Sequence, residues 1–428
     1  MAEVRGLRAI RYDQEQAGAP LDALVAPPYD VIDDAMRAEL ITRSPRNIVE
    51  IDLPLPPAGD PSADRYECAG ATLGSWLGQG VMVAEDDQSI WPIEQSYTGP
   101  DGKRRVRRGV LCRVRLAEYG DGIRAHERTQ PGPKRDRLLL TRATRTNLSP
   151  IFSLYEGDAW DLLADGIGGE PWGVATDGDG TETRAWRLDD GATIDAFSAS
   201  LVSRELLIAD GHHRYETALA YRDERAESDG EPSEADFVLM ALVGLDDPGL
   251  TVFPTHRLLT EVADDDAARE RLGSGIRELF DVEEVAEAEL DPCASAGVGI
   301  FGYLDAYHRK PLRLTLSDAG RRLVAEHSHG HSEAYRDLDA AILETVVLRH
   351  LLQLSEDDIA AKKGLAYTPS AEQGVAMIES GSADAGFFLR PTPIESIRSV
   401  ASAGEAMPPK STYFFPKLPT GIVLNPLG

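Results

Sequence analysis

Lysine is scarce in this chain of 428 residues, which has seven lysines and 37 arginines. Acidic residues are abundant: Asp and Glu number 72, and the formal net charge is −28. Such a charge argues against anionic partners such as nucleic acid or acidic lipid. An acidic surface with little lysine also suits high salt, where repulsion between carboxylates is screened over about 3 Å at 1 M ionic strength. We therefore expect a halophilic protein, whose net charge reflects the solvent more than the ligand.

Cysteine and long apolar runs are also lacking. The three cysteines, Cys68, Cys112 and Cys293, are widely spaced and form no CxxC pair, which excludes a disulfide framework and a zinc ribbon and fits a reducing compartment. No apolar run approaches the roughly 18 residues of a membrane span, and the first residues lack the apolar core of a secretory signal. The sequence predicts a soluble, cytoplasmic protein with no membrane partner.

Hydrophobic residues make up 42% of the chain, enough to bury a large core divided into two or three lobes. Short apolar runs alternate with helix-like patterns, which predicts a fold between α/β and α+β with a mixed sheet in each lobe. We expect an N-terminal α+β lobe at 1–122, a central unit at 123–260, and a C-terminal α+β lobe at 261–428 whose tail returns to the central unit.

Several elements can be predicted from local patterns. Helical spacing recurs within 60–84, 261–285 and 337–354, and a turn at 99–102 predicts a hairpin. The run "DFVLMALVGL" is typical of a buried strand. Residues 321–334, with the string "HSHGH", are predicted as strand or hairpin; the three histidines are either part of an exposed polar loop or metal ligands.

The most distinctive stretch is "LLIADGHHRYETALAYRDE", residues 206–224. Its first four residues form a short apolar run typical of a buried strand, and Tyr215, Ala218 and Leu219 then recur at helical spacing. Gly211 between them permits the positive φ or close backbone approach that a sharp turn needs. The sequence therefore predicts a strand, a turn and a helix.

This predicted turn has the chemistry of a phosphate-binding site. It would place the free N–H groups of His212, His213 and Arg214 at the positive end of a helix dipole, where an oxyanion is favoured. Arg214 can add a bidentate contact, and a protonated histidine can donate to a phosphate oxygen. A metal at either histidine is an alternative, although adjacent histidines seldom face the same ion and no HExxH accompanies them. A structural N-cap by Asp210 is another.

The segment 123–155 is locally rich in basic residues in an otherwise acidic chain. Two interpretations stay open: a solvated basic helix face, or a pocket wall that binds an anion. Near the C-terminus, "PPKSTYFFPK" places Lys410 and Lys417 in a loop stiffened by proline, where a flexible cation suits a phosphate.

The stretch "ELLIADGHHRYETAL" resembles the phosphate-binding box of the ParB/sulfiredoxin-like superfamily. Its Asp-Gly-His-x-Arg pattern is similar to that of the ADP-dependent free serine kinases. Over nearly the whole length, "APPYDVI", "IADGHHRYETA" and "MPPKSTYFFPKLPTG" also resemble a bacterial and archaeal domain-of-unknown-function family, DUF1015. The resemblance implies a central ParB/sulfiredoxin-like unit and a phosphotransferase with L-serine as the hydroxyl acceptor.

The resemblance implies roles for specific residues. Glu127 becomes the candidate base, with Asp210 and His212 as further catalytic candidates; a salt bridge from Glu127 to a neighbouring arginine is the alternative. Candidates for binding the donor phosphates are Gly211, His213, Arg214, His126, Lys134, Arg137, Lys410 and Lys417. Candidates for binding the acceptor are Asn147, Ser149, Thr412 and Tyr413, and Tyr29, Asp30, His256 and Arg257 could border the same pocket.

The donor is ADP, ATP or pyrophosphate, with Mg²⁺ expected on its phosphates. No P-loop defines the donor further. Two other functions remain: a ParB-like nucleotide-binding switch without small-molecule turnover, or a phosphohydrolase. No basic helix-turn-helix is visible, so nucleic acid is not an expected partner. The sequence does not indicate an oligomeric state.

Overall fold

The computed structural model describes residues 2–56, 59–60, 62–99, 102–127, 131–229 and 233–428. Its internal contacts group the chain into two compact units. Unit 1 comprises Met1–Ala125, Thr129–Thr251 and Pro416–Gly428, and unit 2 comprises His126–Arg128 and Val252–Phe415. These units cut across the three predicted segments, because 123–260 contributes to both and the last residues of the chain return to unit 1.

Unit 1 is built on a mixed sheet of nine described strands. Parallel pairs, β6 with β11 and β8 with β12, alternate with antiparallel ones. The strands follow the order β6 (Ile123–Arg124), β11 (Leu206–Asp210), β8 (Ile151–Tyr155), β12 (Phe237–Gly244), β5 (Arg104–Arg115), β4 (Trp91–Thr98), β10 (Glu182–Ala185) and β9 (Gly173–Thr176), with β1 (Val4–Arg5) beside β5.

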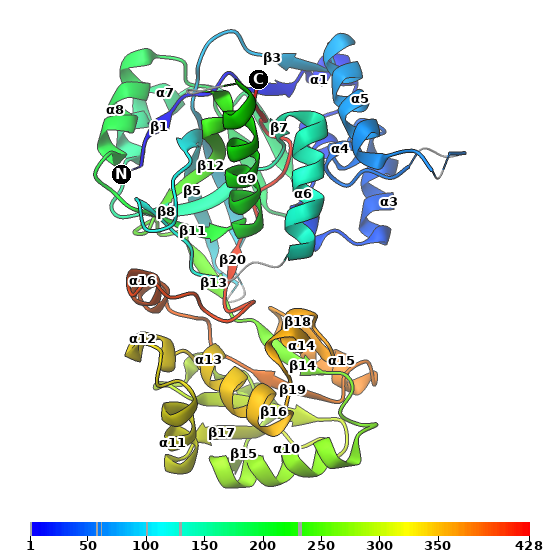
Figure 1. Cartoon of the computed structure of the whole chain (residues 1–428), viewed down its shortest axis with the longest axis vertical. Coiled ribbons are helices and arrows are strands. Elements are labelled where there is room, and N and C mark those ends of the chain that lie inside the picture. The colour runs from blue at the N-terminus through cyan, green and yellow to red at the C-terminus, as the bar shows by residue number, and fades with distance from the viewer. Residues whose placement is uncertain (1, 57–58, 61, 100–101, 128–130, 230–232) are drawn as a thin grey trace. The chain divides into compact units, whose positions relative to one another are not determined.

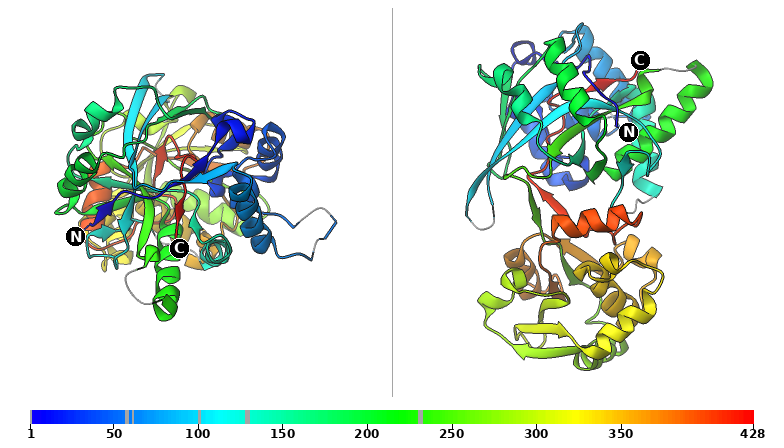
Figure 2. Two further views of the ribbon diagram at one scale, coloured as in Figure 1. Left: turned by 90° about the horizontal axis from the view of Figure 1, so that it is seen from above. Right: turned by 90° about the vertical axis from the view of Figure 1, so that its left-hand side faces the viewer.

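The predicted hairpin and the predicted buried strand are both confirmed. Strands β4 and β5 pair antiparallel on either side of the turn at 99–102, of which residues 100–101 lie outside the described chain. Figure 2 shows the two strands in cyan as a long hairpin. All eight residues of β12 are buried. Such a continuous apolar run is expected of a central strand that is covered on both faces.

Helices α8 (Gly191–Leu201) and α9 (His212–Asp229) pack on one face of this sheet and close the core of unit 1 (Figure 1). Phe197, Leu201 and Tyr215 from these helices meet Cys112, Val238 and Met240 of the strands. Helix α6 (Pro131–Thr144) lies beside α9, and α5 (Arg65–Gly78) packs against α6. The rest of unit 1 includes α1 (Gln14–Ala17), α2 (Leu21–Leu24), α3 (Asp34–Arg43), α4 (Val49–Asp52), α7 (Ala164–Ile167), and the strand pairs β2 (Ile10–Tyr12) with β3 (Met82–Ala84) and β7 (Thr146–Asn147) with β21 (Asn425–Pro426).

Unit 2 has its own antiparallel sheet of six described strands. Their order is β15 (Phe280–Glu284), β17 (Leu312–Leu316), β16 (Ile300–Asp305), β19 (Ala385–Phe388), β14 (His256–Leu259) and β18 (Leu365–Thr368). The predicted buried helix at 337–354 is α13 (Asp339–Leu343), which continues as a π-helix over Glu344–Leu351. The remaining helices are α10 (Asp266–Leu279), α11 (Asp318–His327), α12 (Glu333–Arg336), α14 (Glu356–Ala360), α15 (Ala371–Glu379) and α16 (Ile394–Ser402).

The prediction of a strand or hairpin at 321–334 is wrong, because most of this segment is helical. Ser317 caps the N-terminus of α11, and Gly320 and Val324, four residues apart, form its buried face. The three histidines of "HSHGH" contact different groups. Nδ1 of His327 lies 3.0 Å from the carbonyl O of Leu323, and Nδ1 of His329 lies 2.8 Å from the carbonyl O of Glu326. Nδ1 of His331 lies 2.9 Å from the carboxylate Oε1 of Glu405.

Together the two sheets and their helices confirm a mixed α/β fold with a large mixed sheet and several smaller sheets. Of the described helices, none is both long enough and apolar enough to cross a membrane. The three cysteines are free thiols, with Cys112 buried in unit 1 and Cys293 exposed.

Candidate functional site

The predicted strand, turn and helix are present where β11 ends and α9 begins. The register of β11 against β8 shifts between Ile208 and Asp210, the last residue of the strand. Gly211 then takes a φ of +96°, which a residue with a Cβ rarely adopts. Its carbonyl accepts the first helical bond of α9, from the N–H of Tyr215 at 3.0 Å. The amides of His212, His213 and Arg214 therefore form the first turn of an 18-residue helix.

The guanidinium of Arg214 folds back onto this turn. A Cβ at Gly211 would lie 3.0 Å from both Nε and Nη2 of Arg214, so the turn needs glycine for space as well as for its φ. Nη1 donates to the carbonyl O of Pro150, and Nη2 lies 3.7 Å from Oδ2 of Asp210. Nε is buried and has no hydrogen-bond partner among the residues that the structure describes. The side chain is only 12% exposed, so its charge is held close to the turn.

The C-terminal tail also reaches this turn. Nζ of Lys417 lies 3.4 Å from Oδ2 of Asp210, and the carbonyl O of Lys417 accepts a hydrogen bond of 3.0 Å from Nε2 of Gln95. Burial lowers the pKa of the Arg107 guanidinium to about 10. The negative charge of nearby Asp210 opposes this effect and raises the pKa. Asp210 is thus surrounded by cations, which exceed it in charge.

Beside Arg214, unit 1 contains a small cavity of about 40 Å³. A cavity of this size has room for a small polar group, since a single water needs roughly 10–15 Å³. The walls come from α4, α6, β7, α9 and the loop that precedes β8. Its polar residues are Asp52, Arg137, Thr141, Thr146, Asn147, Ser149, Arg214 and Thr217. Four predicted site residues, namely Arg137, Asn147, Ser149 and Arg214, therefore line the same cavity.

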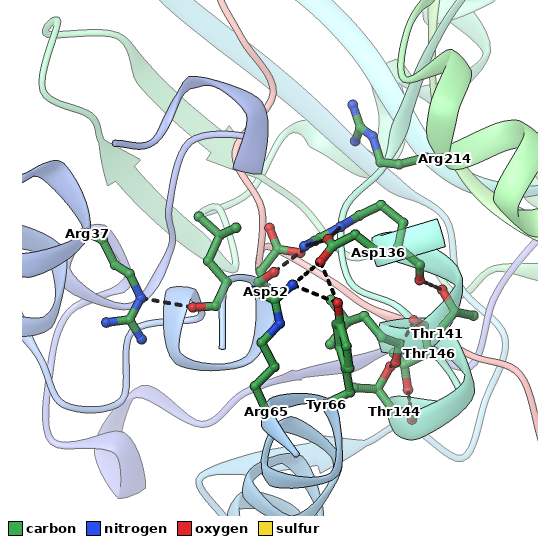
Figure 3. Close-up of polar contacts among 12 residues, drawn as sticks. Arg37, Asp52, Arg65, Tyr66, Asp136, Thr141, Thr144, Thr146 and Arg214 are labelled. Atoms are coloured by element: carbon green, nitrogen blue, oxygen red, sulfur yellow. Dashed lines mark hydrogen bonds and ion pairs between the residues drawn. The ribbon is translucent and has the colours of Figure 1, made fainter. Parts of the chain in front are cut away.

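A buried cluster of charged groups forms one wall of this cavity. Nη1 of Arg137 donates to Oδ1 of Asp52 at 3.0 Å, and Nη2 and Nε donate to Oδ2 of Asp136 at 2.6 and 2.8 Å. Arg65 and Tyr66 bind the other oxygen of Asp136. Figure 3 shows this network, with Arg214 extending its guanidinium away from it. A second cavity, of about 180 Å³, is lined by Arg65, Asp136 and Arg137 among others.

Asp52 is the functional candidate that the sequence analysis missed. Its side chain is 3% exposed, and Oδ2 has no hydrogen-bond partner. Burial raises the pKa of this carboxyl group, although the neighbouring guanidinium of Arg137 opposes the effect. In the sequence Asp52 stands within the apolar run "VEIDLPLPP", and an acid in such a run is the one local signal for a buried carboxylate.

The other unit 1 candidates have protein partners. Nζ of Lys134 forms an ion pair of 2.7 Å with Oε2 of Glu216, across α6 and α9. Oδ1 of Asn147 accepts from the backbone N–H of Leu239 at 3.1 Å and from Nδ2 of Asn425 at 2.9 Å. Asn147 thereby fastens β7 to β12 and to the tail. Ser149 is buried at the cavity wall.

The remaining candidates lie together in unit 2, where the segment at His126 pairs with the loop at 407–412. The N–H of Met407 donates to the carbonyl O of His126 at 2.7 Å, and that of Lys410 donates to Oε1 of Glu127 at 2.9 Å. Nε2 of His126, whose ring is fully buried, lies 3.0 Å from Oγ1 of Thr412.

Further contacts stiffen this region of unit 2. Tyr413 stacks on Phe253 with ring centroids 6.3 Å apart. Arg257 is fully buried and lies over the ring of Tyr367, 5.4 Å from its centroid. Nδ1 of His256 accepts a hydrogen bond of 3.1 Å from the N–H of Leu389. The candidate residues thus fall into two groups, one in each unit. Those in unit 2 are His126, Glu127, His256, Arg257, Lys410, Thr412 and Tyr413, and the others lie in unit 1.

Comparison with protein families gives one match: a family described as "Protein of unknown function (DUF1015)", over residues 4–341. No curated protein matches the chain. Solved structures with similarity include a conserved hypothetical protein from Pyrococcus furiosus, with 16% identity and a TM-score of 0.36, covering 71% of this chain and 91% of that one. A free serine kinase in complex with AMP has 14% identity and a TM-score of 0.36, covering 72% and 97%. C-terminally truncated SbnI from Staphylococcus aureus has 11% identity and a TM-score of 0.35, covering 71% and 82%.

Proposed function

The chain belongs to the DUF1015 family of proteins of unknown function, so we propose a function from its own residues: a small-molecule phosphotransferase. It moves phosphate from a nucleotide or pyrophosphate to a hydroxyl acceptor, for which free L-serine is the first candidate. The donor phosphate binds at the turn between β11 and α9. The observation that carries the proposal is the guanidinium of Arg214, folded over Gly211 at the N-terminus of a long helix.

Three features of the turn support an anionic ligand. The first-turn amides of α9 and the helix dipole favour negative charge at this end of the helix. Nε of Arg214 is buried without a partner, and a buried N–H that lacks a hydrogen bond costs roughly 1–3 kcal/mol, which a phosphate oxygen would recover. Lys417 and Arg214 together exceed the charge of Asp210, so an added anion is electrostatically favoured.

Not every candidate is equally suited to bind phosphate. Arg137 already uses four of its five N–H groups on Asp52 and Asp136, so in our proposal it orders the cavity wall. Lys134, paired with Glu216, can exchange that partner for a phosphate at the cost of one partly exposed ion pair, worth about 0.2–1 kcal/mol. The roles given to Glu127 as base, to Asp210 and His212, and to the unit 2 residues stay predictions.

The expected Mg²⁺ has a poor fit to these residues. Magnesium on donor phosphates is usually held by one or two carboxylates of the protein as well. Asp210 is the carboxylate at the turn, and it faces Lys417 and Arg214, which compete with a cation for its oxygens. Within the described residues, no group of three or more His, Cys, Asp or Glu is placed to hold a metal ion. We therefore derive no step through Mg²⁺.

One assay separates the proposed function from its alternatives. The full chain is incubated at high salt with L-serine and, in turn, ADP, ATP and pyrophosphate, and the products are analysed by mass spectrometry. O-phosphoserine supports the phosphotransferase. Free phosphate without phosphoserine supports a phosphohydrolase, and donor binding without either product supports a nucleotide-binding switch. Absence of both products and of donor binding contradicts a phosphate site at the turn.

A further inference from the structure

Among the described residues, two buried side-chain atoms of the residues that line the cavity beside Arg214 have no hydrogen-bond partner: the donor Nε of Arg214 and the acceptor Oδ2 of Asp52. Oδ2 of Asp52 is buried and accepts no hydrogen bond, although its twin Oδ1 is held by Arg137. Water-excluded carboxylate oxygens are normally hydrogen-bonded, because their desolvation is costly. Asp52 lines the cavity, so a donor located there could satisfy this oxygen.

The neighbouring hydroxyl groups of the wall also present acceptors to the cavity. Oγ1 of Thr141 donates to the carbonyl O of Arg137, and Oγ1 of Thr146 donates to that of Thr144, both at 2.9 Å. Oγ1 of Thr217 donates, at 3.4 Å, to the carbonyl O of Lys134. A hydroxyl has a single proton, so these three oxygens have only lone pairs left for a ligand.

The cationic groups of the wall do not meet this need. The guanidinium of Arg137 is directed at Asp52 and Asp136, and one of its N–H groups at most is left. Arg214 donates to Pro150 and extends away from Asp52 (Figure 3). None of these contacts gives Oδ2 of Asp52 a donor, so a ligand that satisfies this oxygen must bring an N–H or O–H group of its own.

We propose that this cavity binds a hydroxyl or ammonium group of a small polar molecule, and that Oδ2 of Asp52 accepts its hydrogen bond. This inference rests on the proposed function only in identifying the molecule as the phosphate acceptor. A pKa of Asp52 raised by burial agrees with it, since the carboxylate lacks the stabilisation that such a donor would supply. An α-amino acid with a hydroxyl side chain carries both kinds of donor.

The test compares two carboxylates bound to the same arginine. Asp52→Asn changes the oxygen that faces the cavity, whereas Asp136→Asn is the control, because both oxygens of Asp136 have protein partners and Asp136 belongs to the neighbouring cavity. Calorimetry measures binding of L-serine, of L-alanine, which has the ammonium alone, and of D-glycerate, which has hydroxyls alone. We expect Asp52→Asn to weaken binding of L-serine at least about tenfold, as expected for one charge-assisted hydrogen bond, and Asp136→Asn to weaken it less than about threefold.

If L-alanine binds and D-glycerate does not, the ammonium group occupies the cavity. If D-glycerate binds and L-alanine does not, the hydroxyl group occupies it. Either result supports the inference. Absence of binding by all three, equal affinity in Asp52→Asn, or equal loss in both variants overturns it. If Asp52→Asn does not fold, Thr217→Val removes another acceptor of the wall: weaker binding of L-serine supports the inference, and unchanged binding overturns it. If L-serine binds but no O-phosphoserine forms, only the proposed phosphate transfer is contradicted. If O-phosphoserine forms but Asp52→Asn binds L-serine with unaltered affinity, only this inference is contradicted.

Discussion

At the scale of single residues, burial decides which charged groups serve the site and which serve the fold. Arg142 and Glu224 form an exposed pair at 2.5 Å, and such pairs contribute about 0–1 kcal/mol. Arg137 with Asp52 is buried, and removing one partner of a buried pair costs roughly 3–5 kcal/mol, because the other charge is left uncompensated. Asp52→Ala is therefore expected to impair folding, which is why the isosteric Asn variant is the one used to test binding.

His256 gives a residue-scale prediction about pH. Burial lowers its pKa to about 4, and the N–H that Leu389 donates to Nδ1 requires the neutral ring. In the unfolded chain this histidine has an ordinary pKa of about 6.5. Between pH 6.5 and 4 it is therefore protonated in the unfolded chain but neutral in the folded protein. Stability is therefore fully present above pH 6.5 and is lost as pH falls through this window, by on the order of 3 kcal/mol.

Urea denaturation of the wild type and of His256→Gln at several pH values measures this effect. Glutamine cannot be protonated, so the difference in unfolding free energy between the two proteins should shrink as pH falls from 6.5 to 4. A difference that stays constant with pH would show that the pKa of His256 is the same in the folded and unfolded protein, which contradicts the prediction. His308→Gln, at an exposed histidine, serves as the control for the substitution itself.

The local chemistry of the turn was predictable from sequence, whereas its partners were not. Gly211 and Arg214 are three positions apart, and the glycine indicated the positive φ that the turn adopts. The guanidinium folded back over the turn was not predicted. Asp52, by contrast, is brought to the cavity by tertiary packing, and Arg137, its partner, is 85 positions away. A single sequence holds no periodicity or spacing that encodes such a contact.

At the scale of elements, α6 explains the basic segment at 123–155, for which two interpretations were open. One face is solvated, with Arg142 bound to Glu224, and another carries Arg137 into the cavity wall. The helix thus has a solvated basic face and also contributes to a cavity wall, and anion binding by that wall stays a prediction. The segment at 321–334 was mispredicted because its histidines and serines suggested alternation, whereas the buried face of α11 is set by Gly320 and Val324.

The contact of α5 with α6 supplies an element-scale prediction. A Cβ at Gly70 would lie 2.5 Å from the carbonyl O of Ala143, so the two helices approach as closely as they do because position 70 has no side chain. Gly70→Ala should push α5 away from α6 and destabilise the protein by about 1–3 kcal/mol. The measurement is the unfolding free energy from chemical denaturation.

Gly74 on the same helix is the matched control. A Cβ there meets nothing within 4 Å, so Gly74→Ala should gain helix propensity and stabilise the protein by about 0.5–1 kcal/mol. Opposite signs for the two substitutions are the expected result. Two stabilising substitutions would mean that α5 and α6 are further apart than described.

At the scale of the whole molecule, the chain returns to unit 1 after unit 2 is complete. The tail at 416–428 contributes β21 and brings Lys417 to Asp210. Local sequence patterns predicted many of the elements. The division of the chain into units depends on contacts between segments far apart in sequence, which local patterns do not encode.

The net charge of −28 leads to a prediction about salt. Repulsion among carboxylates acts over a Debye length of about 10 Å at 0.1 M salt and about 3 Å at 1 M. The thermal unfolding midpoint should therefore rise as NaCl is increased over this range, and sucrose at equal osmolality should raise it less. A midpoint that is unchanged or lower at 1 M NaCl would contradict the expectation of a halophilic protein.

The most direct test of the central claim is the affinity of Arg214→Ala for pyrophosphate and ADP, measured by calorimetry at constant salt. Arg142→Ala, which removes the same charge from an exposed pair on α6, is the control. We predict that Arg214→Ala weakens binding by about 2 kcal/mol, roughly 30-fold, while Arg142→Ala changes it less than about twofold. Unchanged affinity in a folded Arg214→Ala protein would contradict a phosphate site at the start of α9.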